Sequence, residues 1–469
     1  MERLKPMDAQ FVDAEDQDGH ASFAIASIAV FEGPAPTYDE FYAGVNGRLP
    51  LVPIYRRKLR KVPFRLGPPV WVDDPNFDLR YHIRQTALPA PGGDAQLGDL
   101  IARVMAQRLD RDFPLWEYWL VQGLSGGRWA LISKVHHSMV DGVSGTDLYR
   151  VIFDLSPEPA LPAAPGSRPV APEPSGLALA ASAAGDMVAR LDRGARALAD
   201  ALSRPGDSMH EASHTARAVA RLASSARPAT ESSLSGPIGR QRRYAWARAS
   251  LAEVKTIKRK LGGTVNDVVL AAISSGFRAL LISRGERPER HMVPSLIPVS
   301  LRLPGEESSY ANRVSVVLAD LPVELAEPVD RLATIRREMS ELKAVREASA
   351  AEALTTLGRF TPFPLASLVV RLAYWLPQRE IVTVTTNVPG PQQPLYGMGR
   401  RLVEIIPYVP IATRLRTGVS IFSYCGQLTF GITGDYATTA DIGVLARGIK
   451  RGIEELTEAA QQHPAGVAG

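Results

Sequence analysis

The feature that most constrains this chain is an apolar run that ends in two consecutive histidines. Residues 129–135 have the composition of a buried β-strand, and residues 146–153 have the apolar spacing of a helix. His136 and His137 therefore lie where a strand ends and a loop opens toward a helix. Loops held by a rigid scaffold often carry catalytic groups. The sequence thus predicts a site at this strand end.

The two histidines are not expected to act together. Consecutive residues of an extended chain point to opposite faces, so one ring should face a cleft and the other the packing behind it. A neutral imidazole can take a proton from an alcohol or a thiol near neutral pH. Asp141 follows His137 by four residues and can fold back to fix the ring, directly or through a basic partner. Gly142 would permit the tight backbone that this return needs.

Two other interpretations of the histidines stay open. A histidine is often only a packed or solvated residue. Histidine and aspartate are also metal ligands. However, the two side chains should diverge, the chain has only 8 histidines, and no Cys/His cluster lies nearby to complete a metal site. We therefore predict no metal.

Length and composition bound the class of protein. A chain of 469 residues exceeds one ordinary core, which favours two domains, and 45% hydrophobic residues with 22% charged ones indicate a globular protein. Its only cysteine, Cys425, lies in a strand-like setting and is expected to be buried, in a reducing compartment. The N-terminus lacks the apolar core of a signal peptide, and we expect no helix to span a bilayer.

Four further motifs accompany the histidines. Asn266 and Asp267 open a long helix that runs to residue 281, and Thr264 or Asn266 could cap it. Thr386 and Asn387 end a strand and precede Val-Pro-Gly-Pro, a fixed bend. The remaining motifs are Pro-Leu-Trp at 114–116 and Pro-Val-Ser-Leu-Arg at 298–302.

These motifs together carry a resemblance. The sequence His-His-Ser-Met-Val-Asp-Gly at 136–142 resembles the HHxxxDG signature of the CoA-dependent acyltransferase superfamily, which includes chloramphenicol acetyltransferase and peptide-synthetase condensation domains. With the Asn-Asp and Asn-Val-Pro-Gly-Pro motifs, the chain resembles the bacterial wax ester synthase/diacylglycerol acyltransferase family, of the actinobacterial triacylglycerol synthase type. The resemblance runs from Asp8 to Asp435 and leaves residues 155–230 unmatched.

The resemblance implies an α/β fold. Two chloramphenicol-acetyltransferase-like domains, each a mixed β-sheet with helices, should meet at a central cleft or tunnel. The sequence divides into an N-terminal acyltransferase domain at 1–154, a Pro/Ala-rich linker with crossover helices at 155–234, and a C-terminal acyltransferase-like domain at 235–469.

The resemblance also implies a reaction and roles for residues. His137 should be the general base that takes the hydroxyl proton of diacylglycerol, or of a long-chain alcohol, for direct attack on an acyl-CoA thioester. His136 and Gly142 should support the loop, and Asp141 should pair with Arg302. The candidates for the oxyanion or the cleft are Thr386, Asn387, Asn266 and Asp267, although Asn266 and Asp267 are equally well interpreted as a helix cap.

Partners and location follow from the same resemblance. Long-chain acyl-CoA is a substrate, so no cofactor is expected, and no basic-aromatic pattern indicates a nucleic acid. We expect a cytoplasmic protein in peripheral contact with the inner face of the plasma membrane or with lipid droplets. Two alternatives stay open. One is an acyltransferase of the same superfamily with another hydroxyl or amine acceptor, and the other is a non-catalytic lipid-binding or lipid-droplet protein.

Two other segments have more than one interpretation. The basic run at residues 55–61 is either a solvated face or a surface that steers acyl-CoA or an anionic membrane. The apolar helix expected at residues 364–376 could line an acyl channel, lie in a lipid interface, or be a plain core helix.

Overall fold

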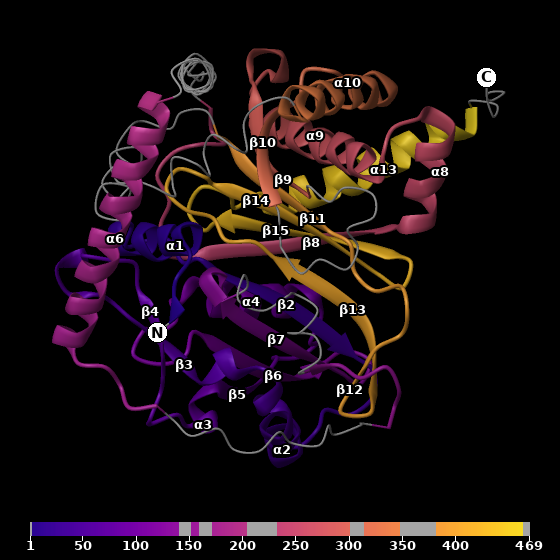
Figure 1. The fold of residues 1–469 in the computed structure, drawn as a ribbon. Helices are drawn as coiled ribbons and strands as arrows, with labels where there is room; N and C mark the ends of the chain where they lie inside the picture. The colour runs from indigo at the N-terminus through magenta and orange to yellow at the C-terminus, as the bar shows by residue number, and fades with distance from the viewer. Residues whose placement is uncertain are drawn as a thin grey trace.

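The computed structural model describes residues 2–139, 152–158, 171–203, 232–300, 314–347 and 381–462. These residues form two six-stranded sheets and one small three-stranded sheet, arranged with their helices in two halves (Figure 1). The predicted α/β fold with two mixed sheets is confirmed. Asp141, Gly142, Arg302 and the helix expected at residues 364–376 lie outside the described residues.

The N-terminal half is built mainly from residues 2–139. Its strands and helices follow one another along the chain in this order: β1 Glu2–Arg3, α1 Pro6–Gln17, β2 Ala24–Phe31, α2 Tyr38–Arg48, β3 Arg57–Arg60, β4 Val70–Asp73, α3 Leu79–His82, β5 Ile83–Ala87, α4 Asp94–Ala106, β6 Trp116–Leu124 and β7 Arg128–His136. A 3₁₀ turn, η4 (His137–Met139), follows β7.

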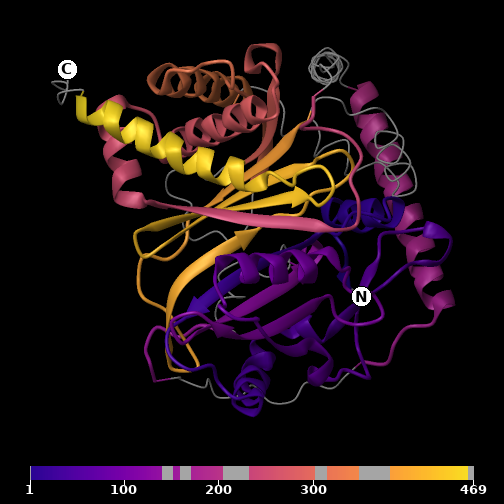
Figure 2. The same cartoon turned by 180° about the vertical axis from the view of Figure 1, so that it is seen from behind.

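The C-terminal half begins after a long helix, α6 (Gly176–Ser203). Its elements are β8 Arg242–Ser250, α8 Leu251–Leu261, α9 Val265–Ser283, β9 Val293–Ser300, β10 Val314–Leu321, α10 Pro328–Glu347, β11 Thr383–Val388, β12 Tyr396–Gly397, β13 Arg400–Tyr408, β14 Thr417–Tyr424, β15 Gln427–Asp435 and α13 Ile442–Gln462. Helices α9, α10 and α13 lie together over the outer face of the C-terminal sheet (Figures 1 and 2).

One strand joins the halves. The C-terminal sheet has the order β10-β9-β11-β14-β15-β8, whereas β12 and β13 belong to the other sheet, in the order β12-β13-β2-β7-β6-β5. Figure 1 shows β13 running from β12 in the lower half toward the upper one, and along this course it pairs antiparallel with β2, Ile406 opposite Ile28. Residues 396–408 fall in the sequence-predicted domain 235–469 but complete the sheet of the N-terminal half.

A close backbone contact holds β13 against the C-terminal sheet. The carbonyl oxygen of Pro407 accepts hydrogen bonds from the hydroxyl groups of Tyr244 on β8 and Ser420 on β14. The same carbonyl lies so near Gly431 of β15 that a Cβ there would be 1.8 Å from the oxygen. Only glycine allows this approach.

A charged network reinforces the same junction. Arg248 of β8 donates to both carboxylate oxygens of Glu404 on β13, at 2.7 and 2.9 Å, and to Asp94 at the start of α4, at 2.7 Å. The bidentate geometry fixes the angle between the partners. Three elements from both halves are therefore joined by one guanidinium group.

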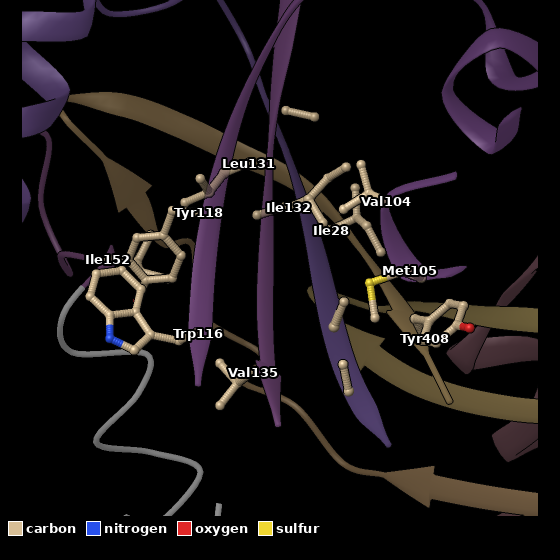
Figure 3. Close-up of a cluster of buried hydrophobic side chains, with 14 of the residues drawn as sticks. Ile28, Val104, Met105, Trp116, Tyr118, Leu131, Ile132, Val135, Ile152 and Tyr408 are labelled. Carbon is tan, nitrogen blue, oxygen red and sulfur yellow. The ribbon is translucent and has the colours of Figure 1, made fainter. Parts of the chain in front are cut away.

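The core of the N-terminal half is aromatic and extends across the junction. Trp116 is fully buried, stacks on Tyr55 and His82 at 4.5 and 4.4 Å, and donates its indole N–H to the Tyr55 carbonyl. The tryptophan of the Pro-Leu-Trp motif is thus a core residue. Figure 3 shows Tyr408 of β13 on the same side of the sheet as Met105 of α4, so a residue of the C-terminal half fills this core.

Helix α9 is long and apolar enough to cross a membrane by length and composition, with a mean hydropathy of 1.5. However, 72% of that window is buried in the protein, against α10 and α13. It is the core helix of the C-terminal half.

The basic run at residues 55–61 is solvated only in part. Arg56 and Lys61 are exposed, whereas Tyr55 and Leu59 are buried, and residues 57–60 form β3. Lys58 contacts Asp74 and Glu173 at 3.3 and 3.4 Å. Arg57 pairs with Glu2 and Asp73, Arg60 with Glu173, and Lys61 with Asp16, whereas Arg56 lies over the Phe77 ring at 5.1 Å. Neutralised cations of this kind attract an anionic ligand weakly.

The expectation that Cys425 is buried was wrong. The residue is exposed at the two-residue turn between β14 and β15. Cys425 and Gly426 both have positive φ, 43° and 81°, which is the geometry of a tight type I′ hairpin. The strand-like composition on both sides concealed this turn.

The crossover region contains a helix, as expected. Leu179 and Ala183 of α6 pack on Val62, Val70 and Val72 of the N-terminal half. Arg3 donates to Ser182 at 2.9 Å and pairs with Asp186. The helix is thus attached along the side of the N-terminal half (Figure 2).

Gly431 provides a test of the junction. We expect Gly431→Ala to lower the free energy of unfolding by about 2–3 kcal/mol, because the added methyl group collides with the Pro407 carbonyl. Gly185→Ala is the matched control: nothing lies within 4 Å of its Cβ position in α6, so this change should stabilise by about 0.5–1 kcal/mol. Urea unfolding measures both. Equal stability of Gly431→Ala and the wild type would contradict the described approach.

Candidate functional site

The two histidines lie at the end of a central strand. β7 lies between β2 and β6, and its last residue, His136, pairs with Ala24 of β2. The backbone N–H of His136 donates to the Leu115 carbonyl and that of His137 to the Phe23 carbonyl, both at 2.9 Å. The chain then turns into η4. Neighbouring segments on both sides therefore fix the point at which the strand ends.

His136 is part of the packing behind the strand. Its side chain is 1% exposed. Its Nδ1 accepts the backbone N–H of Ser138 at 3.2 Å and contacts the Ser138 Oγ at 2.7 Å. A nitrogen that accepts a backbone N–H carries no proton, so in the neutral ring the proton is on Nε2. That nitrogen faces Glu15 of α1, 3.7 Å from its Oε2.

Glu15 is a buried carboxylate with several partners. Its Oε2 accepts a 2.6 Å hydrogen bond from Arg111, and its Oε1 accepts the backbone N–H of Phe23 at 3.0 Å. Burial alone would raise its pKa, but the nearby His136 ring and the Arg111 guanidinium outweigh burial and lower the pKa of Glu15 to about 2. Glu15 is therefore ionised at neutral pH.

His137 has a different environment. It is half-buried, whereas His136 is almost fully enclosed. The ring of Phe11, on α1, lies 4.1 Å from the His137 ring, centroid to centroid, and 5.5 Å from that of Phe23. The pair thus has one enclosed ring and one half-buried ring, and that His137 faces a cleft stays a prediction. The catalytic role of His137 stays a prediction.

The end of α1 reaches the junction of the halves. Asp18, after α1, accepts the backbone N–H of Thr413 at 3.1 Å, and Arg242 of β8 donates to the His20 carbonyl at 2.6 Å. The helix that covers His137 is therefore attached to the C-terminal half (Figure 1).

The two residues of the Asn-Asp motif, Asn266 and Asp267, have different contacts. Thr264 caps α9: its hydroxyl accepts the backbone N–H of Asp267 at 3.2 Å, and the Asp267 carboxylate accepts the backbone N–H of Thr264 at 2.8 Å. This is a capping box. The interpretation of Asp267 as part of a helix cap is confirmed, and Asp267 is 3% exposed.

Asn266 instead contacts the other signature. The amide Nδ2 of Asn387, near the end of β11, donates to Asn266 Oδ1 at 3.2 Å. Thr386 precedes Asn387 and is opposite Ser420 in the parallel pair of β11 with β14. Two motifs 121 residues apart therefore meet at the start of α9.

The candidate residues thus lie in two groups of side chains. One lies around His136 and His137 in the N-terminal half, and the other, Asn266 with Asn387, lies in the C-terminal half. Asp141, Gly142 and Arg302 lie outside the described residues. Within the described ranges, no three His, Cys, Asp or Glu side chains are grouped as metal ligands.

Sequence reasoning missed Glu15 and Arg111. Glu15 follows Phe11 by one helical turn, and Arg111 lies just before the Pro-Leu-Trp motif. The only signal in the sequence was the proximity of Arg111 to that motif, and nothing marked Glu15. Their contact with His136 depends on how α1 packs.

The charge of Glu15 should be visible in the pH dependence of stability. We expect Glu15→Gln to lower the free energy of unfolding by about 3 kcal/mol at pH 7, because the variant leaves Arg111 without its buried anion. A carboxyl group whose pKa falls on folding, here from 4.5 to about 2, contributes stability above pH 4.5 that is lost as the pH falls toward 2. The difference between wild type and variant should therefore shrink below pH 4.5.

Urea unfolding between pH 7 and pH 3 measures this difference. Glu454→Gln is the control, since Glu454 is exposed and its contact with Lys450 is a surface pair. It should change stability by less than about 0.5 kcal/mol. A Glu15→Gln difference that does not change with pH would refute the ionised state.

Comparisons with known proteins agree with this architecture. Residues 4–269 match the family model described as "Wax ester synthase/diacylglycerol acyltransferase catalytic domain", and residues 310–457 match the "WS/DGAT C-terminal domain". A Mycobacterium tuberculosis protein named "Probable diacyglycerol O-acyltransferase tgs1" is 40% identical, over 97% of this chain and 96% of its own.

Solved structures show the same fold. The wax ester synthase/diacylglycerol acyltransferase from Marinobacter aquaeolei VT8 superposes with a TM-score of 0.69 at 26% identity, over 98% of this chain and all of its own. The first condensation domain of the CDA synthetase shares the fold alone, with a TM-score of 0.56 at 15% identity, over 99% of this chain and 98% of its own. The chain belongs to the wax ester synthase/diacylglycerol acyltransferase family of O-acyltransferases.

Proposed function

We propose that this protein transfers the acyl group of a long-chain acyl-CoA to the free hydroxyl group of diacylglycerol, giving triacylglycerol and CoA. A long-chain alcohol as acceptor would give a wax ester. The observation that carries the proposal is the contrast at the end of β7, where His136 is enclosed while the neighbouring His137 ring is half-buried. The names of the similar proteins from M. tuberculosis and Marinobacter support the choice of acceptor.

His137 is the general base of this proposal. Its neutral imidazole removes the proton of the acceptor hydroxyl, and the oxygen attacks the thioester carbonyl carbon. The tetrahedral intermediate then expels CoA as a thiolate, and the imidazolium returns the proton to sulfur. The bonds and protons balance without a metal, a redox partner or a cofactor.

The oxyanion needs hydrogen-bond donors. We assign this role to the C-terminal group, with Asn387 as the first candidate and Thr386 as the second. The amide of Asn387 is held by Asn266, and an amide nitrogen carries two hydrogens, so one can hold the neighbour while the other meets the intermediate. Arg302 is proposed to pair with Asp141 and hold the loop.

Ser138 could be mistaken for a nucleophile, because its hydroxyl contacts His136 and His136 faces Glu15. Such an order resembles a Ser-His-Glu triad. However, Ser138 is 2% exposed, so an acyl group cannot reach its oxygen in this conformation. We therefore propose direct transfer without a covalent acyl-enzyme.

Replacement of His137 tests the proposal. With radiolabelled palmitoyl-CoA and diacylglycerol, His137→Ala should lose at least 100-fold in rate, because the general base is gone. His20→Ala removes an exposed histidine near the same segment and should keep the wild-type rate. Chromatography of the lipid products gives both rates. Turnover by His137→Ala within threefold of the wild type would eliminate the mechanism.

Ser138→Ala distinguishes direct transfer from an acyl-enzyme. Because the proposed chemistry does not use the hydroxyl, this variant should keep at least a tenth of the wild-type rate. A covalent route predicts a loss as large as that of His137→Ala, together with an acylated Ser138 peptide by mass spectrometry in the wild type.

An acceptor panel tests the substrate class. One acyl-CoA is supplied with diacylglycerol, hexadecanol, butanol or an alkyl amine, and products are separated by chromatography. We expect diacylglycerol to give the highest kcat/KM and hexadecanol a lower one. Turnover of the amine alone would favour another acceptor class, and acyl-CoA binding without any product would favour a lipid-binding protein.

We also propose that the protein works at a lipid surface on the cytoplasmic side, in peripheral contact with the membrane or lipid droplets. The acceptor and the product are insoluble in water, which supports this location. Flotation of the protein with diacylglycerol-containing vesicles, but not without vesicles, is the expected result.

A further inference from the structure

We propose that Glu15, held by Arg111, is a positioning residue that sets the place of the His137 ring. The inference rests on the proposed function for its kinetic consequences, but its structural basis is independent of the acceptor. Glu15 lies on α1 and is 2% exposed, so its carboxylate belongs to the interior of the N-terminal half. Two separate routes connect this carboxylate to the backbone around His137.

The first route passes through His136. Glu15 faces the Nε2 of His136, and the opposite ring nitrogen accepts the backbone N–H of Ser138. The ring therefore bridges from α1 to the residue directly after His137. Because His136 itself directly precedes His137, this ring contact fixes the chain on both sides of the proposed base.

The second route passes through Phe23. The backbone N–H of Phe23 donates to Glu15 Oε1 at 3.0 Å, and the carbonyl of Phe23 accepts the backbone N–H of His137 at 2.9 Å. The Glu15 carboxylate thus orients Phe23, and the carbonyl group of Phe23 in turn holds the backbone N–H of His137.

Helix α1 contributes a third contact on the same face. Phe11 and Glu15 are four residues apart, so they lie one above the other on the helix surface. Phe11 packs against the His137 ring at a tilt of 34°, while Glu15 holds the backbone near it. A shift or rotation of α1 would therefore move the ring and its backbone support together.

Arg111 keeps the carboxylate in place. It donates to Glu15 Oε2 at 2.6 Å and to the Val12 carbonyl at 3.2 Å, and it also pairs with Asp16. A glutamine at position 15 would keep the size of the side chain, and its oxygen could still accept the backbone N–H of Phe23. However, its amide hydrogens would then point toward both His136 and Arg111, which face the other oxygen, Oε2, in the wild type, so the set of contacts could not be kept.

Kinetics test the proposal. We expect Glu15→Gln to lower kcat about 10- to 30-fold while the KM values for acyl-CoA and diacylglycerol change less than twofold, because small displacements of a catalytic group slow the chemical step. Arg111→Met should act like Glu15→Gln, and Arg111→Lys should recover at least a third of the wild-type kcat. The double variant Glu15→Gln/Arg111→Met should be no slower than either single variant.

The control separates positioning from stability. Asp441→Asn breaks a bidentate pair with Arg284 in the C-terminal half, at 2.6 and 2.7 Å, far from the motif in the chain. Its Tm should fall but its kcat should match the wild type. Wild-type kcat in Glu15→Gln, or an equal loss of kcat in Asp441→Asn, would overturn the proposal.

A second readout does not depend on the acceptor. Diethyl pyrocarbonate modification, followed by mass spectrometry of the peptide, reports the reactivity of His137, with the exposed His20 as internal reference. Glu15→Gln should change the rate at His137 at least threefold and leave His20 unchanged. If the wild type transferred no acyl group to any acceptor, the proposed function would fail, while an unchanged His137 rate would refute the positioning role by itself.

Discussion

The architecture depends on a strand that one half of the molecule supplies to the other. β13 hydrogen-bonds to β2 in the N-terminal sheet, and its Pro407 carbonyl accepts hydroxyl groups from β8 and β14 of the C-terminal sheet. The absence of a side chain at Gly431 lets that carbonyl approach, and Arg248 fixes the angle through Glu404. The halves are thus joined by backbone pairing, not only by side-chain packing. A junction of this kind favours a fixed relative orientation, which a site with parts in both halves requires.

Helix α1 connects the histidine pair to the other half of the molecule. Helix α1 carries Phe11 and Glu15 on one face, and its end contacts Thr413 of the other half through Asp18. His136 is unsuited to proton transfer with a substrate because it is enclosed and both of its nitrogens face protein groups. The first histidine of the motif therefore acts as part of the scaffold, and the proposed chemistry is left to the second.

Local features of the fold were predictable from the sequence. The apolar run before His136 marked a strand, and Thr264 or Asn266 marked the start of α9. Contacts between distant residues were not predictable in the same way. Asn266 and Asn387 were each singled out, but only the fold shows that they touch, and nothing local connects Glu15 with Arg111, 96 residues later. The pairing of β13 with the N-terminal sheet was likewise not predictable, because an alternating pattern identifies a strand but not the strand with which it pairs.

The turn at Cys425 has a practical consequence. The sequence contains one cysteine, and the tight turn between β14 and β15 presents it on the surface of the C-terminal half. A maleimide fluorophore would therefore attach at a single, structurally defined position without any engineered change. With a second dye introduced on the N-terminal half, energy transfer would report whether the two halves stay at a constant separation during turnover.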